Sequence, residues 1–271
     1  MARPDHLPWD CALVTGASAG IGEALSRMLA ARGVGRLVLV ARRVERLDGL
    51  AAELSAAHGT EVEVLAADLA DRDDLLRIEA RLADGDQPVD LLVNNAGLGT
   101  SGHLVGLPPD GEEHEIKVNV IAPVRLTQAA LPGLIERGHG AVLNVSSMAS
   151  YQPSPGSATY AATKAFLTSF SEAIHEEVRG TGVTVTAVLP GFTRTEFQDV
   201  SGPDVGATAP GWAWMSAESV AEAALAATVT GKALCIPGLG YQLIAGATTP
   251  LPRTAKRWIM GRAAAFSGHR R

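Results

Sequence analysis

Short apolar segments alternate with helical patterns along most of this chain. The apolar segments span residues 11–14, 37–40, 62–65, 91–93, 141–145 and 183–189. The helical patterns lie between them, at residues 21–32, 44–57, 75–82, 124–136 and 158–179. Parallel strands need helical crossovers, and strands that are buried on both faces read as continuous apolar runs. The alternation therefore predicts an α/β fold: a doubly wound parallel sheet with helices on both faces, in a single domain over residues 1–271.

Composition and charge exclude several classes of protein. With 46% hydrophobic residues the chain can bury a large core, and its net charge of −6 argues against a nucleic-acid partner. The two cysteines cannot form a disulfide framework, and the seven histidines show no spacing typical of a metal site. We therefore expect neither a metal nor a nucleic acid.

Neither the N-terminus nor the longest uncharged stretch indicates export or membrane insertion. The first ten residues lack the basic and then apolar pattern of a signal peptide. Residues 233–252 carry no charge over the length of a membrane span, but three prolines and three glycines interrupt them. They predict a buried strand with its loops, so we expect a cytoplasmic protein without stable membrane insertion.

The C-terminal part of the chain is basic. No acidic residue follows Glu222, whereas seven basic residues do: Lys232, Arg253, Lys256, Arg257, Arg262, Arg270 and Arg271. Residues 250–271 thus form a basic C-terminal segment, which also carries Trp258 and Ile259. A membrane-surface contact is one interpretation. A solvated terminal helix with little binding to lipid is favoured.

The first apolar segment leads into a glycine-rich turn, TGASAGIG at residues 15–22, and then into a helical pattern. Small residues let the backbone approach a pyrophosphate, whose charge is favoured at a helix N-terminus. The spacing is GxxxGxG and not the GxGxxG of the usual dinucleotide motif, so the match is partial. The candidate cofactor-binding residues here are Gly16, Ser18, Ala19, Gly20, Ile21 and Gly22.

The same turn also matches GxSxG, the nucleophile-elbow motif of serine hydrolases, with Ser18 as the nucleophile. Two features count against this alternative. Little chain precedes the motif to supply the earlier strands of such a fold, and no HGGG-type oxyanion loop is present. A serine hydrolase stays open as the minority hypothesis.

Two arginines, Arg42 and Arg43, follow the second predicted strand. A carboxylate at this position binds the ribose 2′-hydroxyl of NAD, whereas an arginine accommodates the 2′-phosphate of NADP. One charge-assisted hydrogen bond to the phosphate contributes about 1.5–3 kcal/mol, which is roughly a ten- to hundredfold preference. The pair therefore predicts NADP(H) in preference to NAD(H).

Tyr160 and Lys164 are four residues apart in a predicted helix, so both side chains lie on one face. A phenol with its usual pKa of about 10 is a poor acid–base catalyst at neutral pH. A nearby ammonium would lower the pKa of the phenol. By itself this spacing is weak evidence for a catalytic pair, because exposed Tyr–Lys pairs are common on helices.

Together these motifs resemble those of the short-chain dehydrogenase/reductase family, from about residue 12 to residue 195. Besides the glycine-rich turn, the matching motifs are Asp68 with Leu69, the NNAG of Asn94, Asn95, Ala96 and Gly97, Asn119 in KVNV, Ser147 in NVSSMAS, Tyr160 with Lys164, and PGFTRT at residues 190–195. The family's spacing between the serine and the tyrosine is 160 − 147 = 13, which selects Ser147 over Ser146. The resemblance implies a Rossmann-type fold.

The resemblance also implies roles for these residues. Asn119, Ser147, Tyr160 and Lys164 would be catalytic: Ser147 would bind the substrate carbonyl, Tyr160 would exchange its proton, and Asn119 would hold a relay water. Lys164 would lower the Tyr160 pKa and bind the cofactor ribose. The further cofactor-binding positions implied are Asp68, Leu69, Asn95, Ala96, Gly97, Tyr160, Lys164, Pro190, Gly191, Thr193 and Thr195.

The predicted activity is interconversion of a small-molecule carbonyl and a secondary alcohol by hydride transfer from or to NADP(H). A non-catalytic NADP(H)-binding protein is the other alternative. Residues 192–217 are rich in Gly and Pro and predict a substrate lid, whose Phe197, Trp212 and Trp214 favour an apolar substrate. The resemblance further implies a homodimer or a homotetramer.

Overall fold

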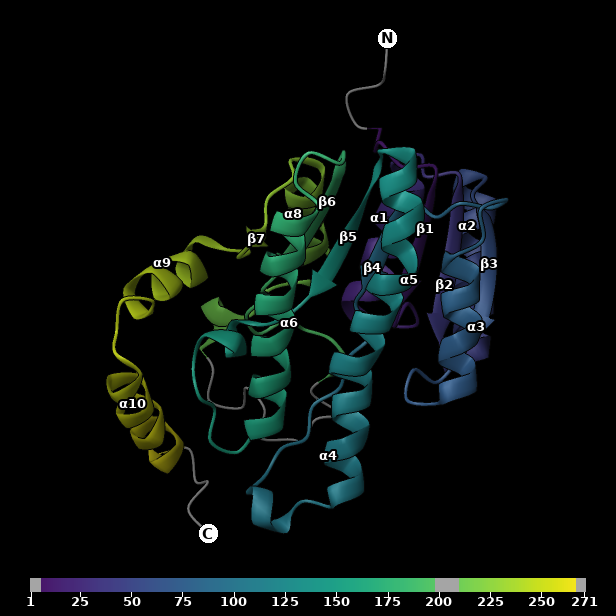
Figure 1. Cartoon of the computed structure of the whole chain (residues 1–271). Helices are drawn as coiled ribbons and strands as arrows, with labels where there is room; N and C mark the ends of the chain where they lie inside the picture. The colour runs from purple at the N-terminus through teal and green to yellow at the C-terminus, as the bar shows by residue number, and fades with distance from the viewer. Residues whose placement is uncertain (1–5, 198–209, 267–271) are drawn as a thin grey trace.

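The computed structural model describes residues 6–197 and 210–266. Within these residues seven strands form one parallel sheet in the order β3-β2-β1-β4-β5-β6-β7 (Figure 1). The strands are β1 (Cys11–Thr15), β2 (Arg36–Ala41), β3 (Glu61–Ala66), β4 (Leu91–Asn94), β5 (Gly140–Val145), β6 (Val183–Val188) and β7 (Leu234–Cys235). All six strand pairs are parallel. The predicted doubly wound parallel sheet is confirmed.

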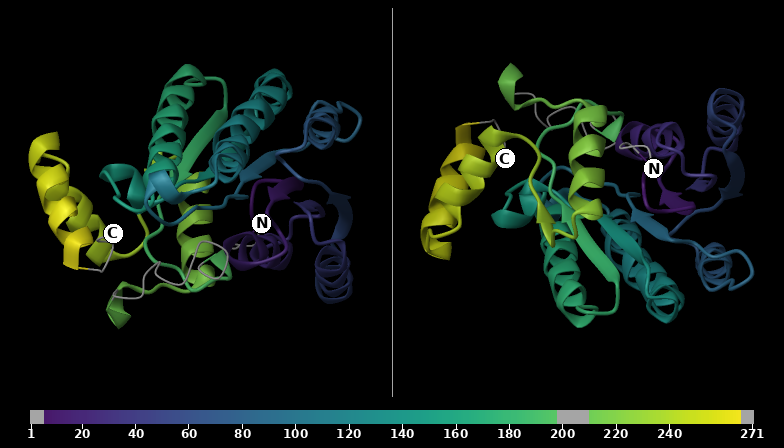
Figure 2. Two further views of the ribbon diagram at one scale, coloured as in Figure 1. Left: turned by 90° about the horizontal axis from the view of Figure 1, so that it is seen from below. Right: turned by 90° about the horizontal axis from the view of Figure 1, so that it is seen from above.

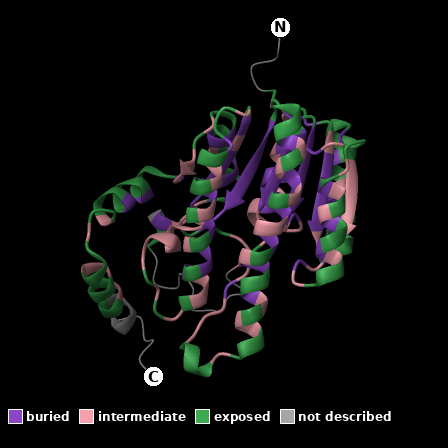
Figure 3. Ribbon diagram, in the orientation of Figure 1, coloured by how far each residue is buried: buried purple, intermediate pink, exposed green. Residues whose placement is uncertain are grey.

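Helices cover both faces of the sheet (Figure 2). One face carries α1 (Gly20–Ala31), α2 (Val44–His58) and α8 (Ala217–Val229). The other carries α3 (Arg72–Leu82), α5 (Ala122–Arg137) and α6 (Ala158–Glu177). Alternate side chains of each central strand enter the two apolar layers, so β1, β4 and β5 are buried along their whole length (Figure 3).

Helix α3 begins three residues before the predicted start at Leu75. Asp71 caps it, because its Oδ1 accepts the backbone N–H groups of Asp73 and Asp74 at 2.9 and 3.0 Å. The first turn is polar and faces solvent. Apolar periodicity alone therefore misses it.

The predicted helix at residues 124–136 is the end of a much longer one. The structure has α4 (Pro109–Ile116), a π-helical turn η2 (Lys117–Ile121) and then α5 in direct succession. Polar residues with one glycine fill α4, so the sequence shows no apolar stripe there. By length and composition residues 109–137 could cross a membrane, but part of their surface packs on the sheet and on α3 and α6.

The prediction of a buried strand with loops at residues 233–252 is correct for the strand but wrong for its burial and for the residues after it. The chain forms only the short, half-buried edge strand β7 and then helix α9 (Leu239–Thr248). The apolar side chains of Leu239 and Leu243 point to solvent, 78% and 74% exposed, so this helix lacks the usual amphipathic pattern. The basic C-terminal segment forms α10 (Arg253–Phe266), and both helices lie at the β7 side of the sheet (Figure 1).

The predicted lid at residues 192–217 is described only in part, since residues 198–209 lie outside the described residues. On either side of them, Thr193 and Met215 form an isolated parallel bridge. A short 3-10 helix, η4 (Gly211–Ala213), lies just before Met215 in the chain. Two further 3-10 turns lie near the site: η1 (Leu104–Gly106) and η3 (Met148–Tyr151).

Candidate active site

A cavity of about 880 Å³ opens at the carboxyl ends of the central strands, where the chain order of the sheet reverses between β1 and β4. Ligands of open α/β sheets bind at such switch points. The cavity brings together all but two of the sequence-predicted site residues: Gly16, Ser18, Ala19, Gly20, Ile21, Arg42, Arg43, Asp68, Leu69, Asn95, Ala96, Gly97, Ser147, Tyr160, Lys164, Pro190, Gly191, Thr193 and Thr195. The two exceptions, Gly22 and Asn119, lie behind its wall.

The glycine-rich turn joins β1 to α1 and leaves no space for a side chain at Gly20 or Gly22. Gly20 has a φ of +58°, and a Cβ built on it would lie 2.9 Å from Thr195. A Cβ on Gly22 would lie 2.4 Å from both Asn95 Nδ2 and the carbonyl oxygen of Gly16. No side chain caps α1, so its first N–H groups keep their hydrogen-bonding capacity on the cavity side.

The NNAG segment is tied to the end of β1. The Thr15 hydroxyl accepts the backbone N–H groups of Asn95 and Ala96 at 3.0 and 3.1 Å and donates to Val93 O. Asn95 Nδ2 in turn donates to Thr15 O at 2.9 Å. These bonds hold the two central strand ends together beneath the cavity.

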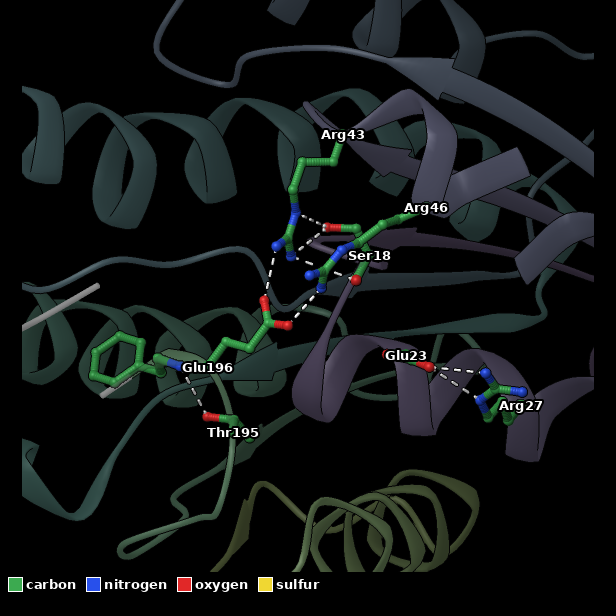
Figure 4. A network of polar contacts seen from close by, with 8 residues as sticks. Ser18, Glu23, Arg27, Arg43, Arg46, Thr195 and Glu196 are labelled. Atoms are coloured by element: carbon green, nitrogen blue, oxygen red, sulfur yellow. Dashed lines mark hydrogen bonds and ion pairs between the residues drawn. The ribbon is translucent and has the colours of Figure 1, made fainter. Parts of the chain in front are cut away.

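The arginines after β2 have different neighbours, and Figure 4 shows those of Arg43 and Arg46. Arg43 donates to Ser18 Oγ from Nε and Nη2 at 3.3 and 3.1 Å, and from Nη1 to Glu196 at 2.7 Å. Arg46 donates to the other oxygen of Glu196 at 2.5 Å, and these bonds lower the pKa of the carboxyl. Arg42 is more exposed, and its Nη1 lies 4.0 Å from Asp68.

The environment of Ser18 argues against the hydrolase alternative. The partner of its hydroxyl in the structure is Arg43, a guanidinium that stays protonated and cannot act as a general base. A serine nucleophile needs an adjacent base that takes its proton.

Ser147, Tyr160 and Lys164 meet at the floor of the cavity. Ser147 begins η3, where its Oγ accepts the Ala149 N–H at 3.1 Å. Tyr160 and Lys164 lie on one face of α6, with Lys164 Nζ at 5.8 Å from the centroid of the Tyr160 ring. Lys164 is 3% exposed, and its Nζ donates to Val145 O at 2.9 Å.

Burial dominates the protonation of this pair. It raises the pKa of Tyr160 to about 12, against the opposing effect of a hydrogen bond with Ser147. It lowers the pKa of Lys164 to about 8. The predicted lowering of the Tyr160 pKa by Lys164 was therefore wrong for this structure, because the ammonium is directed to Val145 O and desolvation of the phenol is the larger effect.

Asn119 lies in the π-helical turn, where it fixes the wall behind Lys164. Its Nδ2 donates to Leu98 O at 2.8 Å and to Thr163 Oγ1 at 3.1 Å, and its Oδ1 accepts the Leu98 N–H. A Cβ on Gly97 would lie 3.2 Å from Lys164 Nζ and 3.3 Å from Asn119 Oδ1. Gly97 therefore lets the lysine and the asparagine approach the wall closely.

The sequence matches the family model described as short chain dehydrogenase over residues 10–205. This chain belongs to the short-chain dehydrogenase family. The matched residues include six of the seven described strands and each of Asn119, Ser147, Tyr160 and Lys164.

Individual short-chain dehydrogenases and reductases resemble it along much of its length. A very-long-chain 3-oxoacyl-CoA reductase from Anas platyrhynchos is 36% identical over 197 residues, which cover 71% of this chain and 62% of that protein, so the chain spans less than two thirds of it. A sulfoacetaldehyde reductase from Chromohalobacter salexigens is 39% identical, with coverages of 79% and 85%. A short-chain dehydrogenase from Sphingobium yanoikuyae in complex with NADPH superposes with a TM-score of 0.80 at 38% identity, covering 88% of this chain and 92% of that one.

The cavity of this short-chain dehydrogenase fits a nicotinamide dinucleotide. The uncapped N-terminus of α1 and the close-packed glycines provide the cradle that a pyrophosphate needs. Arg42, Arg43 and Lys164 line the same cavity and offer cationic groups to a dinucleotide. Among the residues that the structure describes, no cluster of three or more His, Cys, Asp or Glu side chains could hold a metal.

Part of the cavity lining is apolar. Phe192, Phe197, Ile244 and Met260 line it, and Phe197 lies 5.5 Å from the Tyr160 ring between centroids. Trp214 does not line the cavity but packs on Phe192.

Tyr241 anchors the segment that carries these aromatics, a contact that no pattern in the sequence predicts. Its hydroxyl accepts the Phe192 N–H at 2.9 Å and donates to Ala213 O at 2.7 Å. We expect Tyr241→Phe to lower the free energy of unfolding by about 1–3 kcal/mol, because it leaves two backbone groups unpaired. Denaturant unfolding measures the loss, and the KM for a carbonyl substrate should rise. An unchanged unfolding free energy would contradict the anchoring role.

Proposed function

We propose that this short-chain dehydrogenase is an NADP(H)-dependent oxidoreductase that interconverts a carbonyl and a secondary alcohol. The observation that carries the proposal is the meeting of Ser147, Tyr160 and Lys164 in the same cavity as the glycine-rich turn. Hydride transfer to a carbonyl requires three groups beside a dinucleotide cradle: a titratable hydroxyl, a second hydroxyl and a cation.

A bound nicotinamide would supply or accept the hydride. In reduction, the Ser147 hydroxyl donates a hydrogen bond to the carbonyl oxygen and stabilises its developing negative charge. Tyr160 gives its proton to that oxygen. With a pKa of about 12 the phenol is protonated at neutral pH and so carries the proton that the reduction transfers. Lys164, on the same face of α6 as Tyr160, would bind the ribose hydroxyls of the bound cofactor and hold the cofactor beside the phenol.

The preference for NADP(H) is supported by the residues after β2. No carboxylate follows that strand, whereas Arg42 and Arg43 line the cavity. The Ser18 hydroxyl, which Arg43 already contacts, would add a further donor for a phosphate. We assign the 2′-phosphate chiefly to Arg42, because Arg43 is engaged by Glu196.

We further propose a small, largely apolar carbonyl or alcohol as the substrate and a cytoplasmic homo-oligomer as the working form. The aromatic lining beside Tyr160 supports an apolar substrate. The exposed side chains of Ile116, Ile121 and Phe166 on the helices beside the site are typical of a subunit contact.

The test is parallel binding of NADPH and NADH to the purified chain, followed by cofactor oxidation with a panel of ketones and aldehydes. We expect tight NADPH binding, weaker NADH binding and turnover of apolar ketones. Binding without any turnover would favour the non-catalytic alternative. Binding of neither cofactor would contradict the proposal.

A further inference from the structure

Helix α4 carries a fully buried carboxyl group beside the cavity. Glu115 is 0% exposed, and its Oε2 accepts both the backbone N–H and the hydroxyl of Thr100 at 2.7 Å. Its Oε1 is buried without a hydrogen-bond partner among the described residues. Burying a carboxyl group with one oxygen unpaired costs folding free energy, so we expect its surroundings to give it a role.

The neighbours of Glu115 on its own helix show which element it faces. Glu112, Glu115 and Asn119 are spaced by three and four residues and share one helix face. Glu112 accepts the Thr159 hydroxyl, and Asn119 donates to Thr163 Oγ1. Because Glu115 lies between these two contacts, it lies alongside the turn of α6 that begins with Tyr160.

The same helix face also fixes the wall of the cavity at two points. Asn119 holds Leu98 through both its backbone groups, and Glu115 holds Thr100 through its N–H and hydroxyl. Thr100 lines the cavity, as do Tyr160 and Lys164 of α6. Glu115 therefore contacts the cavity wall through Thr100. Its place on α4 also sets it against α6, the helix that carries Tyr160 and Lys164.

We propose that Glu115 is a positioning residue of this active site, which fixes the Thr100 wall and places a carboxylate beside the Tyr160–Lys164 pair. The role in turnover rests on the oxidoreductase function proposed above. The electrostatic role does not depend on it.

The charges that face one another across this contact are Glu112, Glu115, Tyr160 and Lys164. Burial lowers the pKa of Lys164, and the carboxylate of Glu115 opposes that change; the same carboxylate raises the pKa of Tyr160. Burial raises the pKa of Glu115 itself, with Glu112 acting in the same direction and Thr100 and Lys164 opposing. Without the carboxylate, Lys164 would lose its proton at a lower pH.

The decisive variant is Glu115→Gln, which keeps an oxygen acceptor for Thr100 and removes only the charge. We expect the pKa of Lys164 to fall by about half a unit to one unit. An NMR titration of isotope-labelled lysine measures this directly, because the chain has only four lysines and Lys164→Arg identifies the signal. In carbonyl reduction by NADPH, the loss of activity at high pH should begin at a correspondingly lower pH.

Two further variants separate charge from structure. Glu115→Asp keeps the charge and should keep the Lys164 pKa near the wild-type value. Glu113→Gln, an exposed change on the same helix that breaks only an ion pair with Lys117, should shift nothing. An unchanged Lys164 pKa in folded Glu115→Gln would overturn the inference whether or not the enzyme turns over. Absence of turnover in the wild type would instead overturn only the proposed function.

Discussion

Replacing Tyr160 by phenylalanine is expected to abolish nearly all turnover while NADPH binding is retained. The substitution removes the hydroxyl that gives its proton to the substrate oxygen and keeps the ring that packs near Phe197. General acid catalysis contributes about a hundred- to ten-thousandfold in rate, so kcat should fall by that factor. Steady-state kinetics on the best ketone of the panel, with NADPH titrated by fluorescence, measures both quantities.

Tyr151→Phe is the matched control for this change. Tyr151 lines the same cavity but lies in η3 and not on α6 beside Lys164. Its loss should leave kcat within about threefold of the wild type. If the Tyr160 variant were as active as this control, the proposed proton donor would be wrong.

Replacing Arg42 by aspartate is expected to reverse the cofactor preference. The change removes a guanidinium from the cavity rim and places a carboxylate where it repels a 2′-phosphate and can bind a ribose 2′-hydroxyl. One lost charge-assisted hydrogen bond together with the new repulsion should weaken NADPH binding by about a hundredfold. NADH binding should stay equal or improve, as parallel titrations of the two cofactors would show.

Arg43→Gln separates the two neighbouring arginines. Arg43 holds Glu196 and Ser18, so its loss should weaken NADPH binding less than the Arg42 change does. If Arg43→Gln weakened NADPH binding more, and Arg42→Asp left the ratio of NADPH to NADH affinity unchanged, the 2′-phosphate site would lie at Arg43.

The parts of the fold that the sequence predicted are those decided by local patterns. Buried parallel strands must be apolar throughout, so apolar runs in the sequence located six of the seven described strands and the region of the seventh. The glycines at 16 and 20 are required by the backbone conformation of the turn itself. The Tyr160–Lys164 pair shares a helix face because of its spacing, and the structure places both side chains in the cavity.

What the sequence did not predict depends on contacts between distant segments. The carboxylate of Glu196 meets Arg43 and Arg46 about 150 residues away in the chain, and no local pattern indicates that pairing. Glu115 lies in a polar stretch that is typical of a solvated loop, yet α6 and Thr100 bury it completely. Burial of a charge is decided by tertiary packing, which a single sequence does not record.

The π-helical turn sets the relative rotation of the two ends of one long helix. Each residue of an α-helix turns the chain by about 100°, so the one extra residue that a π turn accommodates between α4 and α5 offsets their faces by about that angle. The apolar side of α5 can therefore stay on the sheet while α4 directs Glu115 towards α6. Deleting the exposed Ile121 would realign the two ends as a plain α-helix and carry Glu115 out of the interior, although Glu115 and the residues it contacts had not been altered. In this segment the number of residues matters as much as their identity.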